Sequence, residues 1–371
     1  MHIITAGRGA RAALTTLGRR RCFMTTRSAT ELSRELDTQA SYATLEGRSV
    51  ISVSGADAQT FLQGMQCNDM ARALGSGGMF TGFLAPQGRM VADAFLYAAP
   101  EGFLIEVDQR VSARVLKTLQ FYRLRANVTI RDASAEHAIW SVWGGKGDPA
   151  APLNVARTGA AAGTVDSRAP HMGLRLVMGS HLQPSLPAHY SQQSSSDVQL
   201  RRILRGVAEG ADDFVSGVAV PLECNLDYMG GVHFSKGCYV GQELTIRTHH
   251  RGVVRKRLFP VLLGPMELPL SADVGATCML ARPGADIVCV RADDAPRPRR
   301  AAAPGRLGSV VGNVGLAMLR IDDVTAYEAG ANVSFEAVTT NKECVQARPW
   351  TPAWWPQEKG QSSATATTPD A

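Results

Sequence analysis

One short segment of the chain combines the residue types that thiol chemistry requires. Cys238 stands between Gly237 and Gly241, two residues after Lys236 and directly before Tyr239. A nearby cation favours the thiolate, which is the form that attacks an electrophile or binds a soft metal. Glycines let the backbone take a positive φ or approach a ligand closely. The segment predicts a catalytic or metal-binding thiol; the alternative is a small buried apolar residue, the common state of a free cysteine.

The residues on both sides of this segment indicate how the thiol is held. Residues 232–234 alternate between apolar and polar types, and so do residues 244–248. Alternation with a period of two is typical of a strand. We therefore predict that Cys238 lies on a loop between two strands, because functional residues are concentrated on loops that a rigid scaffold positions.

The other cysteines do not add a recognisable metal site. None of the seven forms a C-x-x-C pair; they are Cys22, Cys67, Cys224, Cys238, Cys278, Cys289 and Cys344. This spacing argues against a zinc ribbon and against a self-contained iron–sulfur cage, since both need several thiolates from one chain. In a reducing compartment we expect these cysteines to be free thiols.

The first 30 residues have the composition of a targeting peptide. Six arginines precede the first carboxylate, Glu31; they are Arg8, Arg11, Arg19, Arg20, Arg21 and Arg27. A segment that is rich in arginine, free of acids and without an apolar stretch of secretory type is typical of a mitochondrial transit peptide. We predict that residues 1–23 are this peptide, cleaved after Phe23, and that the mature protein lies in the mitochondrial matrix. The alternative is an unstructured basic tail.

The basic character of the chain belongs mainly to that peptide. Removal of residues 1–23 takes away five arginines and no acids, which lowers the formal net charge from +6 to +1. Because phosphate binding needs a basic patch on the folded protein, we predict no nucleic-acid partner. No apolar run approaches the roughly 20 residues that span a bilayer, so we predict no membrane insertion.

About 350 mature residues are too many for one hydrophobic core and predict two or three units. Residues 24–255 read as an α+β region with antiparallel sheet and two subdomains, with strands at 49–54, 80–84, 90–97, 102–107 and 128–130 and helices after Asp57, at 110–123 and at 198–206. Residues 256–349 read as a β-barrel, with strands at 258–263, 275–280, 287–290, 308–312, 315–321 and 331–335. We predict a disordered insertion near 293–305 and a low-complexity tail at 350–371.

Several ordered motifs resemble one family. Residues 236–243, KGCYVGQE, resemble the motif of the YgfZ-type folate-binding proteins, which are relatives of the glycine-cleavage T-protein (aminomethyltransferase). Further matching motifs follow the same order along the chain: GRxVIxVxGxDA at 47–58, QGRMxxD at 87–93, PLExNLD at 221–227 and GLAMLR at 315–320. The resemblance implies a pseudo-three-fold ring of two antiparallel α+β units and a C-terminal β-barrel, around a central funnel that holds a folate.

The resemblance also implies a function, because the mitochondrial members of this family act in iron–sulfur cluster assembly. We expect a matrix factor for the maturation of [4Fe–4S] targets of the aconitase and lipoate-synthase types, without classical enzymatic activity. Cys238 would be its catalytic thiol and its metal ligand, on a cluster shared with A-type iron–sulfur scaffold proteins as partners. The alternative is a tetrahydrofolate-dependent aminomethyltransferase, whose chemistry needs a carboxylate near the folate amine; Asp93 is the candidate for that acid.

Tetrahydrofolate is the cofactor that the fold implies. A carboxylate can accept two N–H bonds from the 2-aminopyrimidinone edge of a pterin, and a cation suits the glutamate tail. The residues that we expect near the cofactor are Asp93, Glu209, Glu223, Lys236, Tyr239, Gln242 and Arg247. The alternatives are that Glu209 caps a loop, that Glu223 pairs with a surface arginine and that Tyr239 packs against the barrel. The basic stretch 247–257 could hold an anionic tail, face a partner or protect a strand edge.

Overall fold

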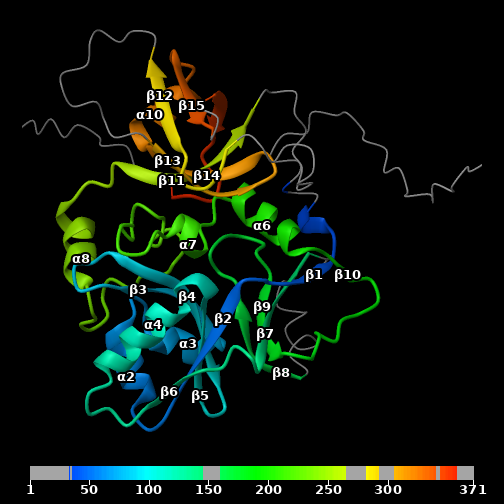
Figure 1. The fold of residues 1–371 in the computed structure, drawn as a ribbon, viewed down its shortest axis with the longest axis vertical. Coiled ribbons are helices and arrows are strands. Elements are labelled where there is room, and N and C mark those ends of the chain that lie inside the picture. The colour runs from blue at the N-terminus through cyan, green and yellow to red at the C-terminus, as the bar shows by residue number, and fades with distance from the viewer. Residues whose placement is uncertain are drawn as a thin grey trace, which may run out of the picture.

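The computed structural model describes residues 33, 36–144, 159–264, 281–291, 305–339 and 343–356 of the 371-residue chain. Two sheets and a closed barrel make up its β structure. The barrel lies at the top of Figure 1 and the two sheets lie below it, with the short helix α7 (Gly210–Asp213) between the barrel and the first sheet. No helix among the described residues is long and apolar enough to cross a membrane.

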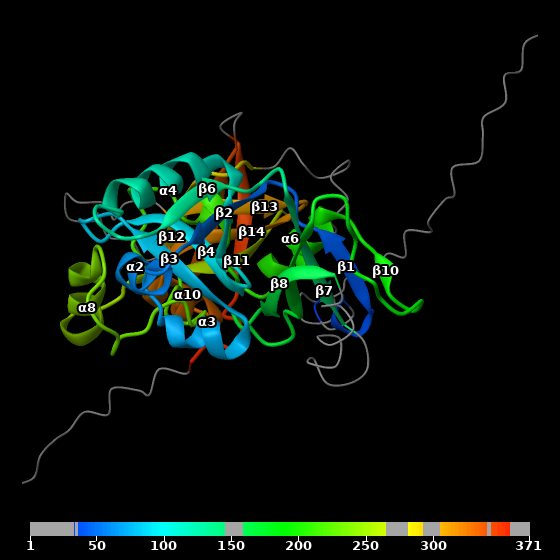
Figure 2. The same ribbon diagram turned by 90° about the horizontal axis from the view of Figure 1, so that it is seen from below.

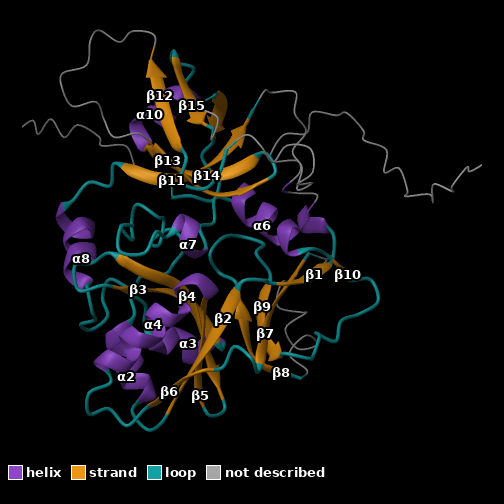
Figure 3. Ribbon diagram, viewed as in Figure 1, coloured by secondary structure: helices purple, strands orange, loops and turns teal. Residues whose placement is uncertain are grey.

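The first sheet is antiparallel and has helices packed against it. Its strand order is β3-β4-β5-β2-β6, with bounds β2 (Arg48–Ser54), β3 (Gly78–Leu84), β4 (Met90–Ala99), β5 (Gly102–Asp108) and β6 (Thr129–Asp132). The helices are α2 (Ala58–Met65), α3 (Met70–Ser76) and α4 (Gln109–Tyr122), seen in purple in Figure 3. In α4 the buried residues Val111, Val115 and Leu119 are four apart and form one apolar stripe against the sheet.

The second sheet has the order β10-β1-β7-β9-β8. Its strands are β1 (Ser41–Thr44), β7 (His137–Trp143), β8 (Ala160–Val165), β9 (Leu174–Gly179) and β10 (Ser191–Gln192). The chain therefore begins this sheet with β1, builds the whole first sheet and then returns. Pairing is antiparallel except between β1 and β10, which are parallel. Helix α6 (Ser195–Leu204) follows, and the side chains of Ser194 and Asp197 form a capping box at its start.

The barrel closes in the order β11-β14-β13-β12-β15-β16. Its strands are β11 (Lys256–Leu263), β12 (Asp286–Arg291), β13 (Gly305–Val311), β14 (Val314–Arg320), β15 (Val333–Val338) and β16 (Cys344–Pro349), with α10 (Ile321–Glu328) after β14. Phe259, Leu307, Phe335 and Trp355 are buried in its core. Trp355 belongs to the predicted low-complexity tail, yet its ring packs against Phe259 at a centroid distance of 4.9 Å.

The predicted fold class, α+β with a C-terminal barrel, is confirmed, whereas one local prediction is wrong. Residues 244–248 are not a strand; they lie inside α8 (Gln242–Arg251), and residues 232–234 form no named strand. Helices α3 and α10 and strand β16 were not predicted from the sequence. The predicted strand 275–280 and the insertion 293–305 lie outside the described residues, except that Gly305 begins β13.

Residues 242–251 satisfy their backbone groups as a helix and pair with none of the described strands. An isolated strand leaves its backbone N–H and C=O groups without partners, whereas a helix satisfies them within one segment. Gly241, with φ of 78°, precedes the helix, and Gly252 closes it by donating its N–H to Thr248 O at 3.0 Å. Thr245 is the one fully buried residue of α8. The alternating residues of 244–248 therefore do not form a buried face of the kind that a strand would present to a core.

Candidate functional site

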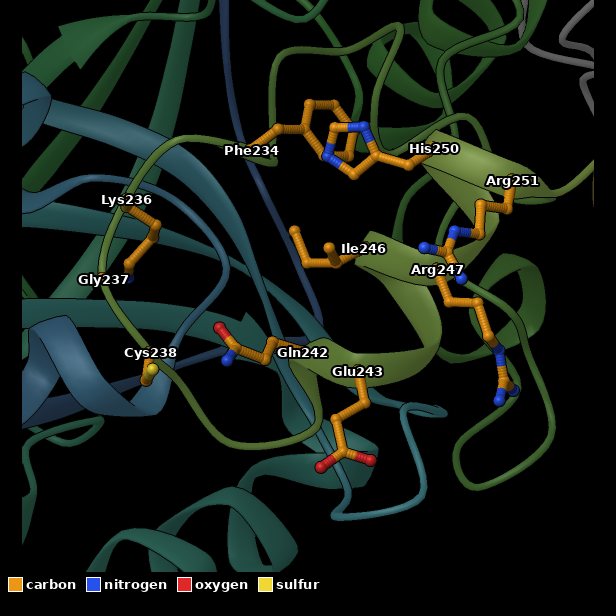
Figure 4. Close-up of a pocket in the computed structure, with 10 residues that line it drawn as sticks. All are labelled: Phe234, Lys236, Gly237, Cys238, Gln242, Glu243, Ile246, Arg247, His250 and Arg251. Carbon is orange, nitrogen blue, oxygen red and sulfur yellow. The ribbon is translucent and has the colours of Figure 1, made fainter.

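Cys238 lies on the segment that leads into α8. This segment and one face of the helix enclose an open cavity of about 660 Å³, shown in Figure 4. The cavity is lined by Phe234, Lys236, Gly237, Cys238, Gln242, Glu243, Ile246, Arg247, His250 and Arg251. Cys238 is exposed, so it is not the buried apolar residue of the alternative interpretation. The structure thus brings together four of the predicted site residues: Lys236, Cys238, Gln242 and Arg247.

Lys236 fixes the position of this segment. Its ammonium donates hydrogen bonds to the backbone carbonyls of Gln63, Gln66 and Asn68 at 2.6, 2.7 and 2.6 Å. The same ammonium lies 5.0 Å from the centroid of the Tyr239 ring. Partial burial lowers the pKa of Lys236 to about 8. Because three carbonyls occupy its three N–H groups, Lys236 serves mainly to hold the thiol segment against the turn between α2 and α3.

Further contacts restrain the same segment on both sides of Cys238. Val240 donates its backbone N–H to Gly64 O at 3.0 Å, and Tyr239 donates its own to Gln242 Oε1 at 3.3 Å. At Gly241 an added Cβ would lie 2.3 Å from Ala85 O, so no larger residue fits this close approach. Tyr239 is buried within the core that includes Phe80 and Leu226. Tyr239 therefore contributes packing, and the exposed atom that the segment presents is the Cys238 thiol.

The helix side of the cavity is one face of α8. The lining residues recur at i, i+1, i+4, i+5, i+8 and i+9, which places them on one side of a helix. Gln242, Ile246 and His250 point toward the segment 234–238 in Figure 4, whereas Glu243 and Arg247 point away from it. The cavity therefore has a thiol at one end, an apolar middle and a basic end.

The other described cysteines differ from Cys238 in position. Cys67 and Cys224 are completely buried, and burial raises the pKa of the Cys67 thiol to about 12 and that of Cys224 well above its usual value. Cys344 is exposed on β16 in the barrel, remote from α8. Among the described residues no group of three or more His, Cys, Asp or Glu side chains is placed to hold a metal ion. Cys238 therefore offers a single thiolate.

The predicted acids Asp93 and Glu209 lie elsewhere, in a buried polar network between the two sheets. Glu209 Oε2 accepts hydrogen bonds from Arg168 Nη1 and Arg175 Nη1, each at 2.7 Å. These arginines hold the pKa of Glu209 well below its usual value, against the effect of burial, which raises it. Glu209 therefore neither caps a loop with its side chain nor remains free, since its charge is balanced by two guanidinium groups.

Asp93 and Glu223 keep carboxylate oxygens available. Asp93 is buried on β4 and accepts a hydrogen bond from Gly210 N at 3.0 Å through Oδ1, while its Oδ2 has no partner in the described structure. Burial raises the pKa of Asp93 to about 6. Glu223 is half-buried, and its carboxylate makes no ion pair or hydrogen bond with a described residue. Both acids raise the pKa of Cys224 by their charge, so they act on a common region of the interior.

Two carboxylates with unpartnered oxygens in one interior region fit the N–H donors of a pterin. Arg247 does not belong to this group, because it lines the cavity beside Cys238. The predicted cofactor residues thus lie in two places. The acids Asp93, Glu209 and Glu223 lie toward the interior, and the other residues lie on the thiol segment and on α8.

Residues 255–357 match the C-terminal β-barrel domain described for CAF17. A relative from Aspergillus fumigatus, named "Iron-sulfur cluster assembly factor IBA57 homolog, mitochondrial", is 36% identical over 88% of this chain and 78% of its own length. A relative of the same name from Mycosarcoma maydis is 34% identical over 84% of both chains.

The chain belongs to the IBA57 family. The resemblance found in the sequence motifs is thereby confirmed. The crystal structure of glycine cleavage system aminomethyltransferase T from Bartonella henselae is also similar, with a TM-score of 0.59, 11% identity and coverage of 87% of this chain and 89% of that one. At this identity the likeness shows that the IBA57-family chain has the aminomethyltransferase fold, and nothing about its activity.

Sequence reasoning missed the basic half of the buried network. Arg48, Arg168 and Arg175 were not among the candidates, although they neutralise Glu106 and Glu209. One local signal was available: Arg175 is the single charged residue in the otherwise apolar strand β9, LRLVMG. A charge at a position that faces a core indicates a buried ion pair. Its partners, however, are far away in the sequence and no spacing identifies them.

Asp93 predicts a measurable pH dependence of stability in this IBA57-family protein. Because burial raises its folded-state pKa from 3.8 to about 6, the folded state binds the proton more tightly than the unfolded state. Stability from this group is present below about pH 4 and is lost as the pH rises to about 6. Asp93→Asn should therefore be stabilised relative to wild type by on the order of 2–3 kcal/mol at pH 7, with less difference at pH 4.

Urea unfolding from pH 4 to pH 7 measures this effect, with Asp286→Asn, at an exposed position of the barrel, as the matched control. A difference between Asp93→Asn and wild type that stays constant over this range would show that the Asp93 carboxyl does not change its protonation there.

Proposed function

We propose that this chain is a mitochondrial matrix factor that assists the maturation of [4Fe–4S] proteins of the aconitase and lipoate-synthase types. Its relatives carry the name of a mitochondrial iron–sulfur cluster assembly factor. In this proposal Cys238 is the working group: its thiolate binds an iron of a cluster that a partner protein carries. The cluster is cargo, which the chain receives and helps to pass on.

The observation that carries this proposal is the single exposed thiol on a restrained segment. An iron–sulfur cluster is held by several ligands, usually four thiolates. The described residues supply one accessible thiol at the cavity and no group of three metal-ligating side chains. One thiolate completes a coordination sphere whose other ligands come from elsewhere. This favours a cluster shared with an A-type scaffold protein over a cluster resident in this chain.

The geometry of the segment suits such ligation. Lys236 and Gly241 hold the backbone on either side of Cys238, so the thiolate can meet a cluster without first ordering a flexible loop. Ligation needs the thiol to lose its proton and involves no net oxidation. A mixed disulfide is the alternative role for the thiol, and it requires an oxidised partner thiol as electron acceptor.

The aminomethyltransferase alternative has weaker support. It rests on a fold that is shared at 11% identity, and folds host unrelated functions. Relatives at 34–38% identity are named assembly factors. The acid proposed for transferase chemistry, Asp93, is buried in the interior with a raised pKa, whereas Cys238 is an exposed nucleophile beside the cavity.

The relatives are named as mitochondrial proteins, and we place this chain in the matrix. The acid-free arginine-rich residues 1–23, which lie outside the described residues, supply the address. N-terminal sequencing of the protein from isolated mitochondria should find a first residue at Met24 or Thr25. An intact Met1 in the mature protein would exclude a cleaved presequence.

Cys238→Ser should abolish the assembly function without unfolding the protein. Serine is nearly isosteric and the site is exposed, so packing changes little, but serine supplies no thiolate for iron. Cells that contain only this variant should lose most aconitase activity and protein lipoylation. Cys344→Ser, which removes the exposed thiol of the barrel, is the matched control and should behave as wild type.

The melting temperatures of both variants separate loss of function from loss of structure. Normal aconitase activity and lipoylation with Cys238→Ser would mean that the thiol is dispensable and that the glycines of the segment only shape its path. Equal losses in both serine variants would point to a general requirement for thiols and would also contradict a specific role of Cys238.

We propose tetrahydrofolate as an additional ligand of the interior, held by Asp93 and Glu223. The support is the unpartnered Oδ2 of Asp93 and the unpaired carboxylate of Glu223. When bound, a reduced folate supplies a carrier for one-carbon units. Calorimetry with tetrahydrofolate should show binding that weakens about tenfold in Glu223→Gln, which corresponds to roughly one lost charge-assisted hydrogen bond. Absence of binding at millimolar folate would remove this ligand and leave the assembly function untouched.

A further inference from the structure

Helix α8 contributes little to the core for its length. Of its ten residues only Thr245 is fully buried, and Glu243, Arg247, His249, His250 and Arg251 are exposed. The helix lies at the left edge of the molecule in both Figure 1 and Figure 2, outside the sheets and the barrel. Most helical stability in proteins comes from packing an apolar face. A mainly polar helix in this position needs another explanation than core formation.

The helix is nevertheless held in place. Leu244 packs so closely on the turn before β4 that a Cβ added to Gly88 would lie 2.5 Å from Leu244 Cβ. At the other end, the rings of His249 and Phe234 are stacked with centroids 3.6 Å apart. One side of α8 is thus attached to the body and to the thiol segment. The opposite side is presented to solvent in a fixed orientation.

That outer side carries cations without counterions. Arg247 and Arg251 are exposed and make no ion pair or hydrogen bond with any described residue, unlike the interior Arg168 and Arg175. His250 is also exposed, although its ring points toward the thiol segment, and Glu243 is the one acid beside these residues. Glu243, Arg247 and Arg251 are spaced four positions apart, so they form a row along the helix. We call Arg247, His250 and Arg251 the basic end of α8.

The basic end and Cys238 line the same cavity but lie at opposite ends of it. From Gln242, beside the thiol, to Arg251 the helix advances nine residues, or about 13 Å at 1.5 Å per residue. A small inorganic anion cannot contact both ends over this distance. A protein surface can cover the basic end with acidic side chains while a group beside that surface reaches Cys238.

We propose that the basic end of α8 is a docking site for an acidic surface of the protein that presents the cluster to Cys238. This inference rests on the proposed assembly function and specifies the chemistry of its partner. Charges at the rim of an interface chiefly steer the encounter of two proteins. Arg247 and Arg251 raise the rate of association and set the orientation, and Cys238 then meets the cluster.

The experiment uses the purified mature chain and a purified A-type scaffold protein without cluster, so that docking is measured apart from ligation. Association rates are recorded at ionic strengths from about 0.02 to 0.3 M, over which charge screening increases strongly. Arg247→Glu/Arg251→Glu should associate about ten- to a hundredfold more slowly than wild type at low salt and with a weaker salt dependence. Its melting temperature should be unchanged, since both arginines are exposed and make no ion pair or hydrogen bond with any described residue.

The matched control is Arg282→Glu/Arg306→Glu, which makes the same change of net charge at exposed positions in the barrel module. Association of this control should stay within about twofold of wild type at 0.15 M salt, where the Debye length is about 8 Å. An unchanged rate in the α8 variant, or an equal loss in the control, would overturn the docking site.

Two further readouts keep this inference separate from the proposed function. If the cluster-free scaffold associates in an arginine-dependent way but the spectrum of the loaded scaffold is identical with wild type and Cys238→Ser, docking stands and ligation fails. If the spectrum depends on Cys238 but association does not depend on Arg247 and Arg251, ligation stands and docking fails. Binding of a tetrahydrofolate polyglutamate that is lost in Arg247→Glu/Arg251→Glu would assign the basic end to a small ligand and overturn protein docking, as would a scaffold that never binds wild type.

Discussion

The structure depends on a buried pairing of carboxylates and guanidinium groups between the two sheets. Glu106, completely buried on β5, accepts hydrogen bonds from Arg48 Nε and Arg175 Nη2 at 2.7 Å and from the Tyr97 hydroxyl at 2.6 Å. Arg175 comes from β9 of the second sheet and also binds Glu209. Removing one partner from such a set leaves an unpaired buried charge, which typically costs about 3–5 kcal/mol. The two sheets are therefore fixed relative to one another by groups that are stable only together.

Charged side chains also attach the barrel and the thiol segment to the rest of the structure. Asp213 accepts hydrogen bonds from Arg202 Nη1 at 2.9 Å and from the backbone of Ser309, on β13, at 2.7 Å. Lys236 holds the thiol segment through three carbonyls. In each case a charged group spends its hydrogen-bonding capacity on positioning. The proposals rest on groups that such contacts leave available: the Cys238 thiol, the basic end of α8, and oxygens of Asp93 and Glu223.

The chain resembles an aminomethyltransferase in fold and the IBA57 family in sequence. The aminomethyltransferase fold is retained across 87% of the chain at 11% identity, which shows that packing and the order of elements survive extensive change of sequence. The relatives in the IBA57 family share 36% identity with the chain. What distinguishes the proposed assembly function from transferase chemistry is the place of the reactive group. Cys238 is exposed at the surface, where a partner protein can reach it. The acids that suit a folate lie toward the interior, where Asp93 is buried.

The sequence by itself determined the fold class and most strands of the first sheet and the barrel, and it singled out Cys238 as the candidate thiol. Those elements were predictable because apolar alternation and glycine-bounded turns report local backbone preference and burial. The alternation at 244–248 misled, because alternation over five residues does not exclude a helix, and the segment is α8 with Thr245 as its buried residue. Tertiary structure alone decided that Lys236 anchors the backbone, that Glu209 is neutralised by Arg168 and Arg175, and that Arg247 belongs with the thiol. The first two outcomes depend on hydrogen bonds between residues 34 to 173 positions apart, and at such separations spacing along the chain carries no information about proximity.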